Sequence, residues 1–420
     1  MNLSIKIFIA LVLSVVVGLI AGEPALPFIN WWIAPIGTIF INLIKMIIVP
    51  IVFFSLVVGM TSIGDTKKLG RIGIKTVLIY LVTTAIAIAI GFAVAGIAHP
   101  GVGLQLTSDA AVKVKEAPGI MQVFVAMVPS NPIDAMAKAL ILPVIVFSLF
   151  VGVGILKVGG ERAEFLIKFF DAGAEVSYKI IGMVMSLAPY GVFALLLPVV
   201  AKNGPSVLLP LISVIACVAV GCAIHAIVVY STMAKVWGGH TPLQFFKGMS
   251  EAMIIAFTTF SSAEALPVNM KNCQEKLGVS REVSSFVLPL GATINMDGAA
   301  ITITIMTLAT AFTMGVQVDI PTAIILSILA TLGACGASGV AGGSLLLIPM
   351  ACSLFGINAD ISMQVVAVGF IIGVIQDSVE TALNSSGDVM FAATAEFHDR
   401  MKRGETVDLT LRNVKKKGGI

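Results

Sequence analysis

The stretch Gly291-Ala-Thr-Ile-Asn-Met-Asp-Gly298 decides the fold. It separates two apolar runs, 283–290 and 299–313, which would otherwise form one helix across a membrane. An amide and a carboxylate two residues apart, flanked by glycines, predict a broken helix whose freed carbonyls and side chains face a polar cavity. A cavity lined in this way is typical of an ion site in a transporter.

The composition outside this stretch is that of a polytopic membrane protein. Of the 420 residues, 58% are hydrophobic and 12% are charged, and the mean hydropathy is +1.03. These values exclude an ordinary soluble domain. The strands of a membrane barrel would alternate apolar and polar residues over about ten positions, whereas the apolar runs here are continuous over about twenty or more. We therefore predict an all-α membrane protein.

The distribution of charge predicts how the chain is oriented in the membrane, and the cysteines predict no further site. The net charge of +3 does not indicate a nucleic-acid partner, because many basic residues gather in short loops and in the tail. The basic loop 64–75 and the basic tail predict that both termini are cytoplasmic. The five cysteines are an odd number without paired metal-ligand spacing, so neither a disulfide framework nor a zinc site is expected. The first apolar run lacks a cleavage site before Glu23 and should be retained.

The apolar runs predict eight transmembrane helices. Their expected positions are 4–22, 33–62, 74–98, a region broken by Pro129 and Pro132 that continues to 158, 166–200, 206–233, 284–316 and 362–395. Two further regions, 241–277 and 320–354, each consist of two half-length segments joined by a tip of small residues. We predict that they are re-entrant hairpins, which are tolerated at membrane depth only when protein surrounds them. Interrupted segments that recur in this way point to the binding site of a secondary transporter.

The last predicted helix carries a stripe of polar side chains. Positions i, i+4, i+7 and i+11 share one face, and they hold Asp377, Thr381, Asn384 and Asp388, with Glu380 at the edge. Each acid would cost about 2.5 to 3.5 kcal/mol in lipid, so the stripe must line a cavity or be paired. A salt-bridge network is disfavoured, because the only basic residues from 250 to 396 are Lys271, Lys276 and Arg281.

Together with Asn295 and Asp297, this stripe offers oxygen donors and no cluster of histidine or cysteine. Hard oxygen donors suit an alkali or alkaline-earth cation. Buried carboxylates can also hold protons, so proton coupling is an alternative. Sodium fits better, because neutral amides and carbonyls supply much of the shell. His225 lies within a predicted span, where a histidine is compatible with a proton relay, but the sequence offers it no partner.

The chain resembles the dicarboxylate/amino acid:cation symporter family, which has the glutamate transporter fold. The resemblance covers nearly the whole chain and rests on Ser261-Ser-Ala-Glu-Ala-Leu-Pro267, on residues 291–298 and 377–388, and on the two glycine- and serine-rich tips. Within the family, the run from 267 to 386 most resembles the bacterial sodium/serine-threonine symporters. The resemblance implies an inner-membrane homotrimer with inverted repeats and an elevator-type mechanism.

The resemblance also implies a division into domains. Residues 1–73 would hold scaffold helices 1 and 2, and 99–205 an extracellular loop and scaffold helices 4 and 5. A mobile transport domain would hold helix 3 at 74–98, and helices 6 to 8 with both hairpins at 206–395. Residues 396–420 would form a cytoplasmic tail.

Three sodium sites follow from the resemblance. The first would be formed by Tyr80, Thr83, Thr84, Asn295 and Asp297, although the three hydroxyls, which share one helix face, also fit a role in helix packing. The second would use the carbonyls of Gly291 and Asn384 with the carboxylate of Asp388. The third would use the sulfur of Met296 and the backbone of Thr293, Thr331, Leu332 and Ala334.

The resemblance further assigns the substrate site. Asp377 would take the amino group and Asn384 the carboxylate, beside Thr381, and the hairpin tips would close over the substrate at Ser262, Ala337 and Ala341. Dicarboxylate carriers have an arginine at the position of Glu380 and a threonine at that of Ala299. An acid at 380 would repel a second carboxylate. Glu380 itself has no evident partner in the sequence.

We therefore expect a sodium-coupled symporter of small neutral amino acids, with L-serine and L-threonine first, and without an organic cofactor. Alternatives are a carrier of alanine or cysteine, a carrier of a cationic amino acid attracted by Glu380, and an anion-leaking channel. Ser338 resembles a nucleophile, but the second hairpin and the last two helices hold no histidine or lysine that would act as its base, so an enzyme is not expected.

Overall fold

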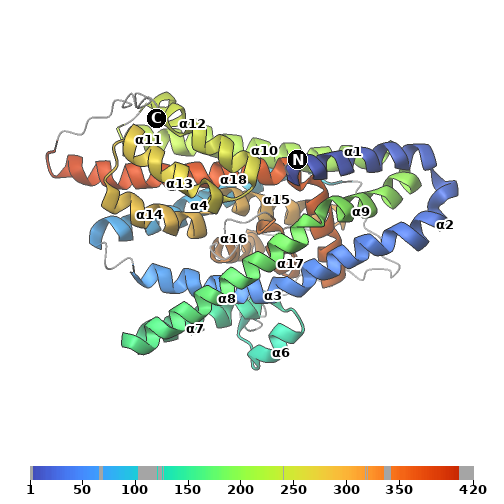
Figure 1. Ribbon diagram of the computed structural model, residues 1–420, viewed down its shortest axis with the longest axis horizontal. Helices are drawn as coiled ribbons and strands as arrows, with labels where there is room; N and C mark the ends of the chain where they lie inside the picture. The colour runs from blue at the N-terminus through green and yellow to red at the C-terminus, as the bar shows by residue number, and fades with distance from the viewer. Residues whose placement is uncertain are drawn as a thin grey trace, which may run out of the picture.

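The fold was analysed in a computed structural model, which describes residues 3–65, 70–102, 121, 125, 127–239, 241–316, 318, 320–334 and 342–405. Every regular element among them is helical (Figure 1). The prediction of an all-α protein is therefore confirmed for the described part of the chain. The continuous apolar runs are the cause, because a helix satisfies its own backbone hydrogen bonds without a neighbouring segment.

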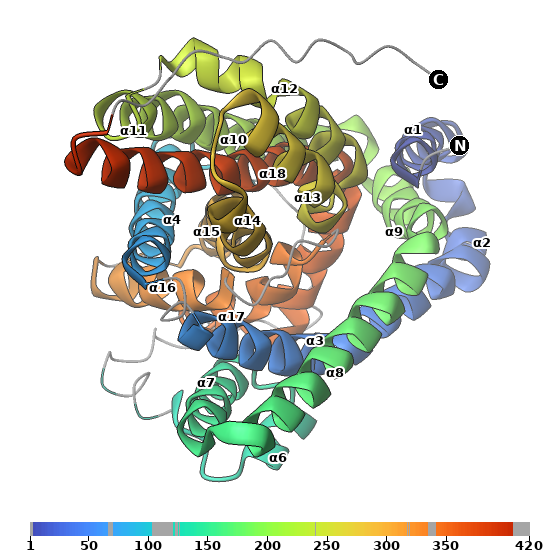
Figure 2. The same cartoon turned by 60° about the vertical axis from the view of Figure 1, so that its left-hand side comes forward.

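A first group of helices lines one side of the molecule (Figure 2). The long helix α3 packs against α7, α8 and α9, and α1 packs against α9. The elements of this group are α1 (Leu3–Ala21), η1 (Glu23–Ala25), α2 (Leu26–Phe28), η2 (Ile29–Ile33), α3 (Ala34–Asp65), α6 (Pro132–Ala137), α7 (Ile141–Val158), α8 (Gly160–Ser186), α9 (Ala188–Asn203) and η4 (Gly204–Val207).

A second group surrounds α15 (Asp297–Thr313), whose residues 297–311 are all buried. A helix that is apolar or small on every face has to be enclosed by others, and α15 contacts α4, α10, α16, α17 and α18. The remaining elements of this group are α4 (Gly70–Ala98), α10 (Leu208–Ile224), η5 (His225–Tyr230), α11 (Ser231–Val236), α12 (Pro242–Thr259), α13 (Ser262–Lys271), η6 (Asn272–Lys276), α14 (Arg281–Ile294), α16 (Ile320–Ala334), η7 (Ser344–Leu347), α17 (Ile348–Ser353) and α18 (Ala359–Lys402).

In the described ranges, five helices are long and apolar enough to cross a membrane. They are Glu23–Thr61, Ile74–Ala98, Leu208–Val236, Val283–Thr313 and Ile361–Lys402. A sixth candidate is the pair α8 and α9, which is bent by 52°. Adding the shorter apolar helices α1 and α7 would give the eight predicted crossings, and that number stays a prediction.

The region predicted as one span over 166–200 consists of two helices. The chain bends at Leu187, between α8 and α9, and Pro189 lies in the first turn of α9. Proline has no backbone N–H to donate and its ring clashes with the preceding turn, so it starts a new helix more easily than it continues an old one. The predicted interruption at Pro132 is confirmed, because Asn131 caps α6 and α7 begins separately at Ile141.

The predicted interruptions in the second group are also found. The helices α12 and α13 meet at Phe260, whose φ of 57° ends α12, and the Ser261 side chain accepts from the backbone N–H of Glu264 at the start of α13. Between α14 and α15 the helix is broken at Asn295 and Met296. The helices α16 and α17 flank the second predicted tip, of which residues 335–341 lie outside the described ranges.

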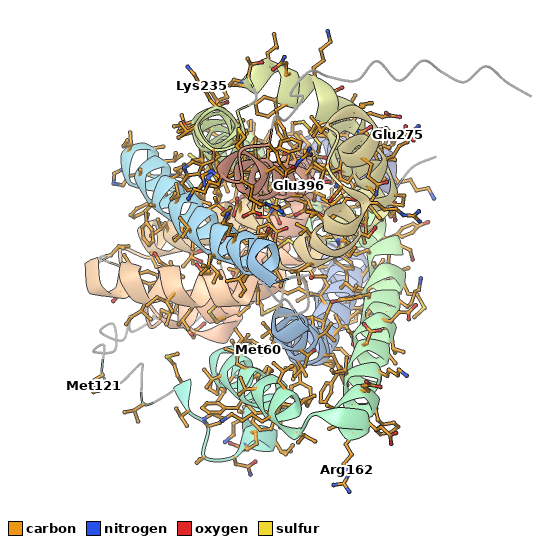
Figure 3. The ribbon with its side chains drawn as sticks, turned by 90° about the vertical axis from the view of Figure 1, so that its left-hand side faces the viewer. Met60, Met121, Arg162, Lys235, Glu275 and Glu396 are labelled. Atoms are coloured by element: carbon orange, nitrogen blue, oxygen red, sulfur yellow. The ribbon has the colours of Figure 1, made fainter. Side chains whose placement is uncertain are left out.

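The last helix is longer than predicted. It continues past 395 to Lys402, and two buried acidic side chains in its final turns have partners outside this helix. The Oε2 atom of Glu396 accepts from the backbone N–H (2.9 Å) and the hydroxyl (3.0 Å) of Ser280, and Asp399 pairs with Lys75 at 3.2 Å. In Figure 3, Glu396 lies among the surrounding helices while Lys235 and Glu275 point outward.

Candidate functional site

The break between α14 and α15 places a buried amide beside a buried carboxylate. The Nδ2 of Asn295 donates to Oδ1 of Asp388 at 3.0 Å and to the carbonyl of Asn384 at 3.1 Å. In the described part of the chain, no donor reaches Oδ1 of Asn295 or Oδ2 of Asp388, although both residues are 0% exposed. Buried acceptors normally have a partner. Two unpaired oxygens on adjoining side chains are ligands of the kind that a hard cation takes.

The carboxylate of Asp297 is held by donors from two other elements. The Thr84 hydroxyl of α4 donates to Oδ1 at 2.8 Å. Two residues of η5 contact the Oδ2 atom. It accepts from the Tyr230 hydroxyl at 3.1 Å and lies 3.1 Å from Nε2 of His225. His225 therefore has a partner, contrary to the prediction, and Tyr230 is a further site residue that was not predicted.

The π-helical geometry of η5 explains this pairing. In a regular α-helix, positions five apart point about 140° away from each other. A turn closed by i→i+5 hydrogen bonds winds more slowly, and such turns occur often at functional sites. The bulge therefore turns His225 and Tyr230 toward the same carboxylate, and their rings meet edge to face with centroids 5.1 Å apart.

The three hydroxyls predicted on α4 have different surroundings. The Tyr80 hydroxyl donates to the carbonyl of Val287 at 3.2 Å. Together with Asp388, it approaches the Cα of Gly291 so closely that a Cβ there would lie 2.7 Å from that hydroxyl. Thr84 reaches Asp297, whereas the Thr83 hydroxyl donates to carbonyls of its own helix at 3.0 and 3.1 Å. The Thr83 hydroxyl thus bonds as the packing interpretation expects, while Tyr80 and Thr84 lie at the break, and the place of Thr83 in a sodium site stays a prediction.

The side chain of Asn384 joins α18 to both sides of the break. Its Oδ1 accepts from the backbone N–H of Gly298 at 2.7 Å, and its Nδ2 lies 3.4 Å from the sulfur of Met296. The start of α15 has N–H groups without intrahelical partners, and Asn384 satisfies one of them. The carbonyl of Asn384 also accepts from Asn295, so an ion bound at Asn295 would affect the position of Asn384.

The residues predicted for a third cation lie on three elements. The half-buried Thr293 donates to the carbonyl of Leu290 at 2.8 Å, and Thr331 donates to Ser327 at 2.7 Å. Thr331, Leu332 and Ala334 belong to the last turn of α16, where carbonyls lack intrahelical partners. Their grouping around Met296 stays a prediction.

The hairpin ends meet α18 at Asp377. Its Oδ2 accepts from the backbone N–H of Gly342 at 2.8 Å, and its Oδ1 accepts from Thr381 at 3.3 Å. A cavity of about 20 Å³, lined by Phe260, Gly342 and Asp377, reaches toward α1 and α8 of the first group. This is room for about one water molecule. The Ser262 hydroxyl is buried, without a hydrogen-bond partner among the described residues, and Ala337 and Ala341 lie outside those residues.

Glu380 has partners that the sequence argument did not find. Its Oε2 accepts from the Ser344 hydroxyl at 2.9 Å and from the amide of Gln376, and Gln376 also donates to Thr302 at 3.1 Å. Gln376 lies four positions earlier on α18, a spacing that places two side chains together, whereas nothing local indicates Ser344. Among the described residues, no lysine or arginine pairs with Asp297, Asp377, Glu380 or Asp388.

A broken helix and short paired helices around buried oxygen donors, in an apolar helical chain, define a secondary transporter of the membrane. The chain belongs to the sodium:dicarboxylate symporter family, whose pattern matches residues 3–396. This confirms the family resemblance derived from the motifs.

Curated relatives match over nearly their whole length. The chain is 40% identical over 417 residues to the serine/threonine transporter SstT of Bifidobacterium adolescentis, covering 98% of this chain and 95% of that protein. It is 38% identical over 396 residues to SstT of Streptococcus thermophilus, with 93% and 94% covered. It is 37% identical over 408 residues to SstT of Enterococcus faecalis, with 96% and 93% covered.

Proposed function

We propose that this chain is a sodium-coupled secondary active symporter of small neutral amino acids, with L-serine and L-threonine as its main substrates. Its membership of a sodium symporter family supports the coupling ion. The serine/threonine transport named for relatives at 37 to 40% identity supports the substrate.

The observation that carries the proposal is the hydrogen bond from the Ser344 hydroxyl to Glu380, at 2.9 Å. A serine or threonine substrate would offer the same hydroxyl donor to the same carboxylate. An aspartate substrate would instead bring a second carboxylate toward two acids, Asp377 and Glu380, which have no lysine or arginine partner in the described ranges. An unpaired buried charge is rejected strongly. The pocket therefore favours a hydroxyl over a dicarboxylate.

For the substrate, we propose that the carboxylate of Asp377 takes the ammonium group, a charge-assisted contact. Asn384 and Thr381 with Ser262, Ala337 and Ala341 would hold the carboxylate end. A cavity of about 20 Å³ is too small for an amino acid. Phe260 and Gly342 must therefore move away from Asp377 before a substrate enters.

For sodium, we propose the three sites that the family resemblance implies. The first would be formed by Tyr80, Thr83, Thr84, Asn295 and Asp297, and the second by the carbonyls of Gly291 and Asn384 with the carboxylate of Asp388. The unpaired oxygens of Asn295 and Asp388 support one ligand in each of these two sites. Met296 with the backbone of Thr293 and of α16 would form a third site. Asn295 donates to the carbonyl of Asn384 at 3.1 Å. An ion at Asn295 would thus orient a substrate-binding residue, which is a physical route for coupling between ion and substrate.

We also propose eight crossings with two re-entrant hairpins, cytoplasmic termini, a homotrimer, and an elevator-type motion of the second helix group against the first. The separation of the two groups in Figure 2 is consistent with this division.

Uptake of labelled L-serine into proteoliposomes under an inward sodium gradient tests the proposal. We expect accumulation above equilibrium that unlabelled threonine blocks and aspartate does not. Asp297→Asn should stop this accumulation, whereas Asp134→Asn should not, because Asp134 is half-exposed and pairs with Lys138, the residue that follows α6. Competition by lysine would indicate a cationic substrate. Uptake driven by a proton gradient alone would indicate proton coupling, and a serine flux that does not saturate would indicate a channel.

A further inference from the structure

A long apolar groove lies on the outside of the second helix group, lined by residues of α4, η5, α11 and the end of α18. Figure 2 shows α4 and α11 beside α18. Its volume is about 800 Å³. On α4 it is lined by Lys75, Leu78, Ile79, Val82, Thr83 and Ile86. These positions form one face of the helix and extend over about 16 Å at 1.5 Å per residue. The groove is therefore long enough for an extended hydrocarbon chain.

The interior of the groove suits hydrocarbon and not a polar ligand. Two of its hydroxyls are already used within their own helices. Thr83 donates to the carbonyls of Ile79 and Tyr80, and the hydroxyl of Thr394 lies 3.5 Å from the sulfur of Met390. The rest of the wall is largely aliphatic, so a polar molecule would lose its hydrogen bonds with water there and gain few in return.

One end of the groove is basic. Lys75, His398 and Lys402 line it, together with Trp237. Lys75 shares the carboxylate of Asp399 with Arg403, at 3.2 and 2.8 Å. Within the described part of the chain, Lys402 has no carboxylate at ion-pair distance. The mouth therefore carries excess positive charge.

We place this basic end at one surface of the membrane, because Lys75 is at the start of the span Ile74–Ala98. Lys402 lines the same end of the groove. The basic segments next to both positions predict the cytoplasmic side. Tryptophan is enriched at this depth of a bilayer. Basic pockets between helices on the cytoplasmic side are suited to anionic lipid headgroups.

We propose that this groove binds one anionic phospholipid, with an acyl chain along α4 and the phosphate against Lys402, Lys75 and His398. The charge of the mouth argues for this occupant. The chain's own segment 406–420 carries Lys415, Lys416 and Lys417, which the basic mouth would repel. A transmembrane helix of a partner would fill the apolar part and leave the lysines without a counterion.

Fluorescence quenching of Trp237 in vesicles tests this proposal with the full chain. The protein has three tryptophans, so Trp31→Phe with Trp32→Phe leaves Trp237 as the only reporter, at the mouth of the groove. Phosphatidylglycerol with brominated chains, diluted into phosphatidylcholine, should quench it at a lower mole fraction than brominated phosphatidylcholine does.

Lys402→Gln should weaken the apparent affinity for phosphatidylglycerol about fivefold, the factor that corresponds to about 1 kcal/mol per basic residue at an anionic surface. Lys6→Gln, at an exposed position of α1, is the matched control and should not change this affinity. Val82→Phe should lower quenching by both lipids, because residue 82 lines the groove and a larger side chain fills it.

Equal quenching by the two brominated lipids would overturn the proposal, and so would a preference that Lys402→Gln leaves unchanged. Quenching by neither lipid, with Trp237 also shielded from aqueous iodide, would mean that protein covers the groove, and this too would overturn the proposal.

Discussion

Replacing Gly291 by alanine should weaken sodium binding at the proposed site of Asp388 without removing any ligand. A Cβ at this position would lie 2.5 Å from Oδ1 of Asp388 and 2.7 Å from the Tyr80 hydroxyl. Ordinary contacts of a Cβ begin at 3.4 Å, so the carboxylate has to retreat by about 0.9 Å. Residue 291 is followed by the break in the helix, and its carbonyl still accepts from the N–H of Asn295 at 2.8 Å.

The size of the effect follows from the contact that the retreat breaks. Oδ1 of Asp388 accepts from Asn295 at 3.0 Å. A retreat of about 0.9 Å directed away from Asn295 would take this distance outside the range of a hydrogen bond. A hydrogen bond to a charged group contributes about 1.5 to 3 kcal/mol, which corresponds to roughly a tenfold to hundredfold change in an equilibrium constant. We expect the sodium concentration for half-maximal serine uptake to rise by that factor.

The assay is serine uptake into proteoliposomes at increasing sodium concentration, with variants matched for folded protein by gel filtration. Gly96→Ala is the control, because it lies on α4 and a Cβ there meets nothing within 4 Å. In an exposed helix position the added methyl group should stabilise the helix by up to about 1 kcal/mol. A folded Gly291→Ala protein whose sodium dependence matches that of Gly96→Ala would refute the assignment of Asp388 as a sodium ligand.

Three further outcomes are expected. Tyr230→Phe keeps the ring but removes a donor to Asp297 at 3.1 Å. The sodium concentration for half-maximal serine uptake should therefore rise about tenfold. A value equal to that of the exposed control Tyr190→Phe would show that sodium binding does not need this bond. Ser280→Ala removes the cap of α14 and the bond to Glu396, which should lower the unfolding free energy by about 1 to 2 kcal/mol; a denaturant midpoint in detergent equal to that of the wild type would contradict this. Glu380→Arg should let aspartate compete for binding, because arginine pairs with a second carboxylate, and loss of serine uptake without any binding of aspartate would leave the role of Glu380 in selectivity unsupported.

Much of the fold was accessible from the sequence, because the membrane restricts what a local pattern can mean. Continuous apolar runs require helices, and the Asn-Met-Asp motif cannot continue one through lipid. The break at Asn295 and the inward orientation of Asp377 and Asp388 follow from that restriction, and both are found. The bend at Leu187 was missed, although Pro189 is a local signal for it.

The partners within the site depended on tertiary structure. The sequence predicted that Glu380 and His225 lie on helices and Asp297 at a helix break, but not which neighbour each one meets. His225 is 72 residues from Asp297, and Ser344 is 36 residues from Glu380. A periodic pattern gives the direction of a side chain around its own helix axis. Only the packing of the helices decides what lies opposite that side chain, and at η5 a π-helical turn also changes the direction itself.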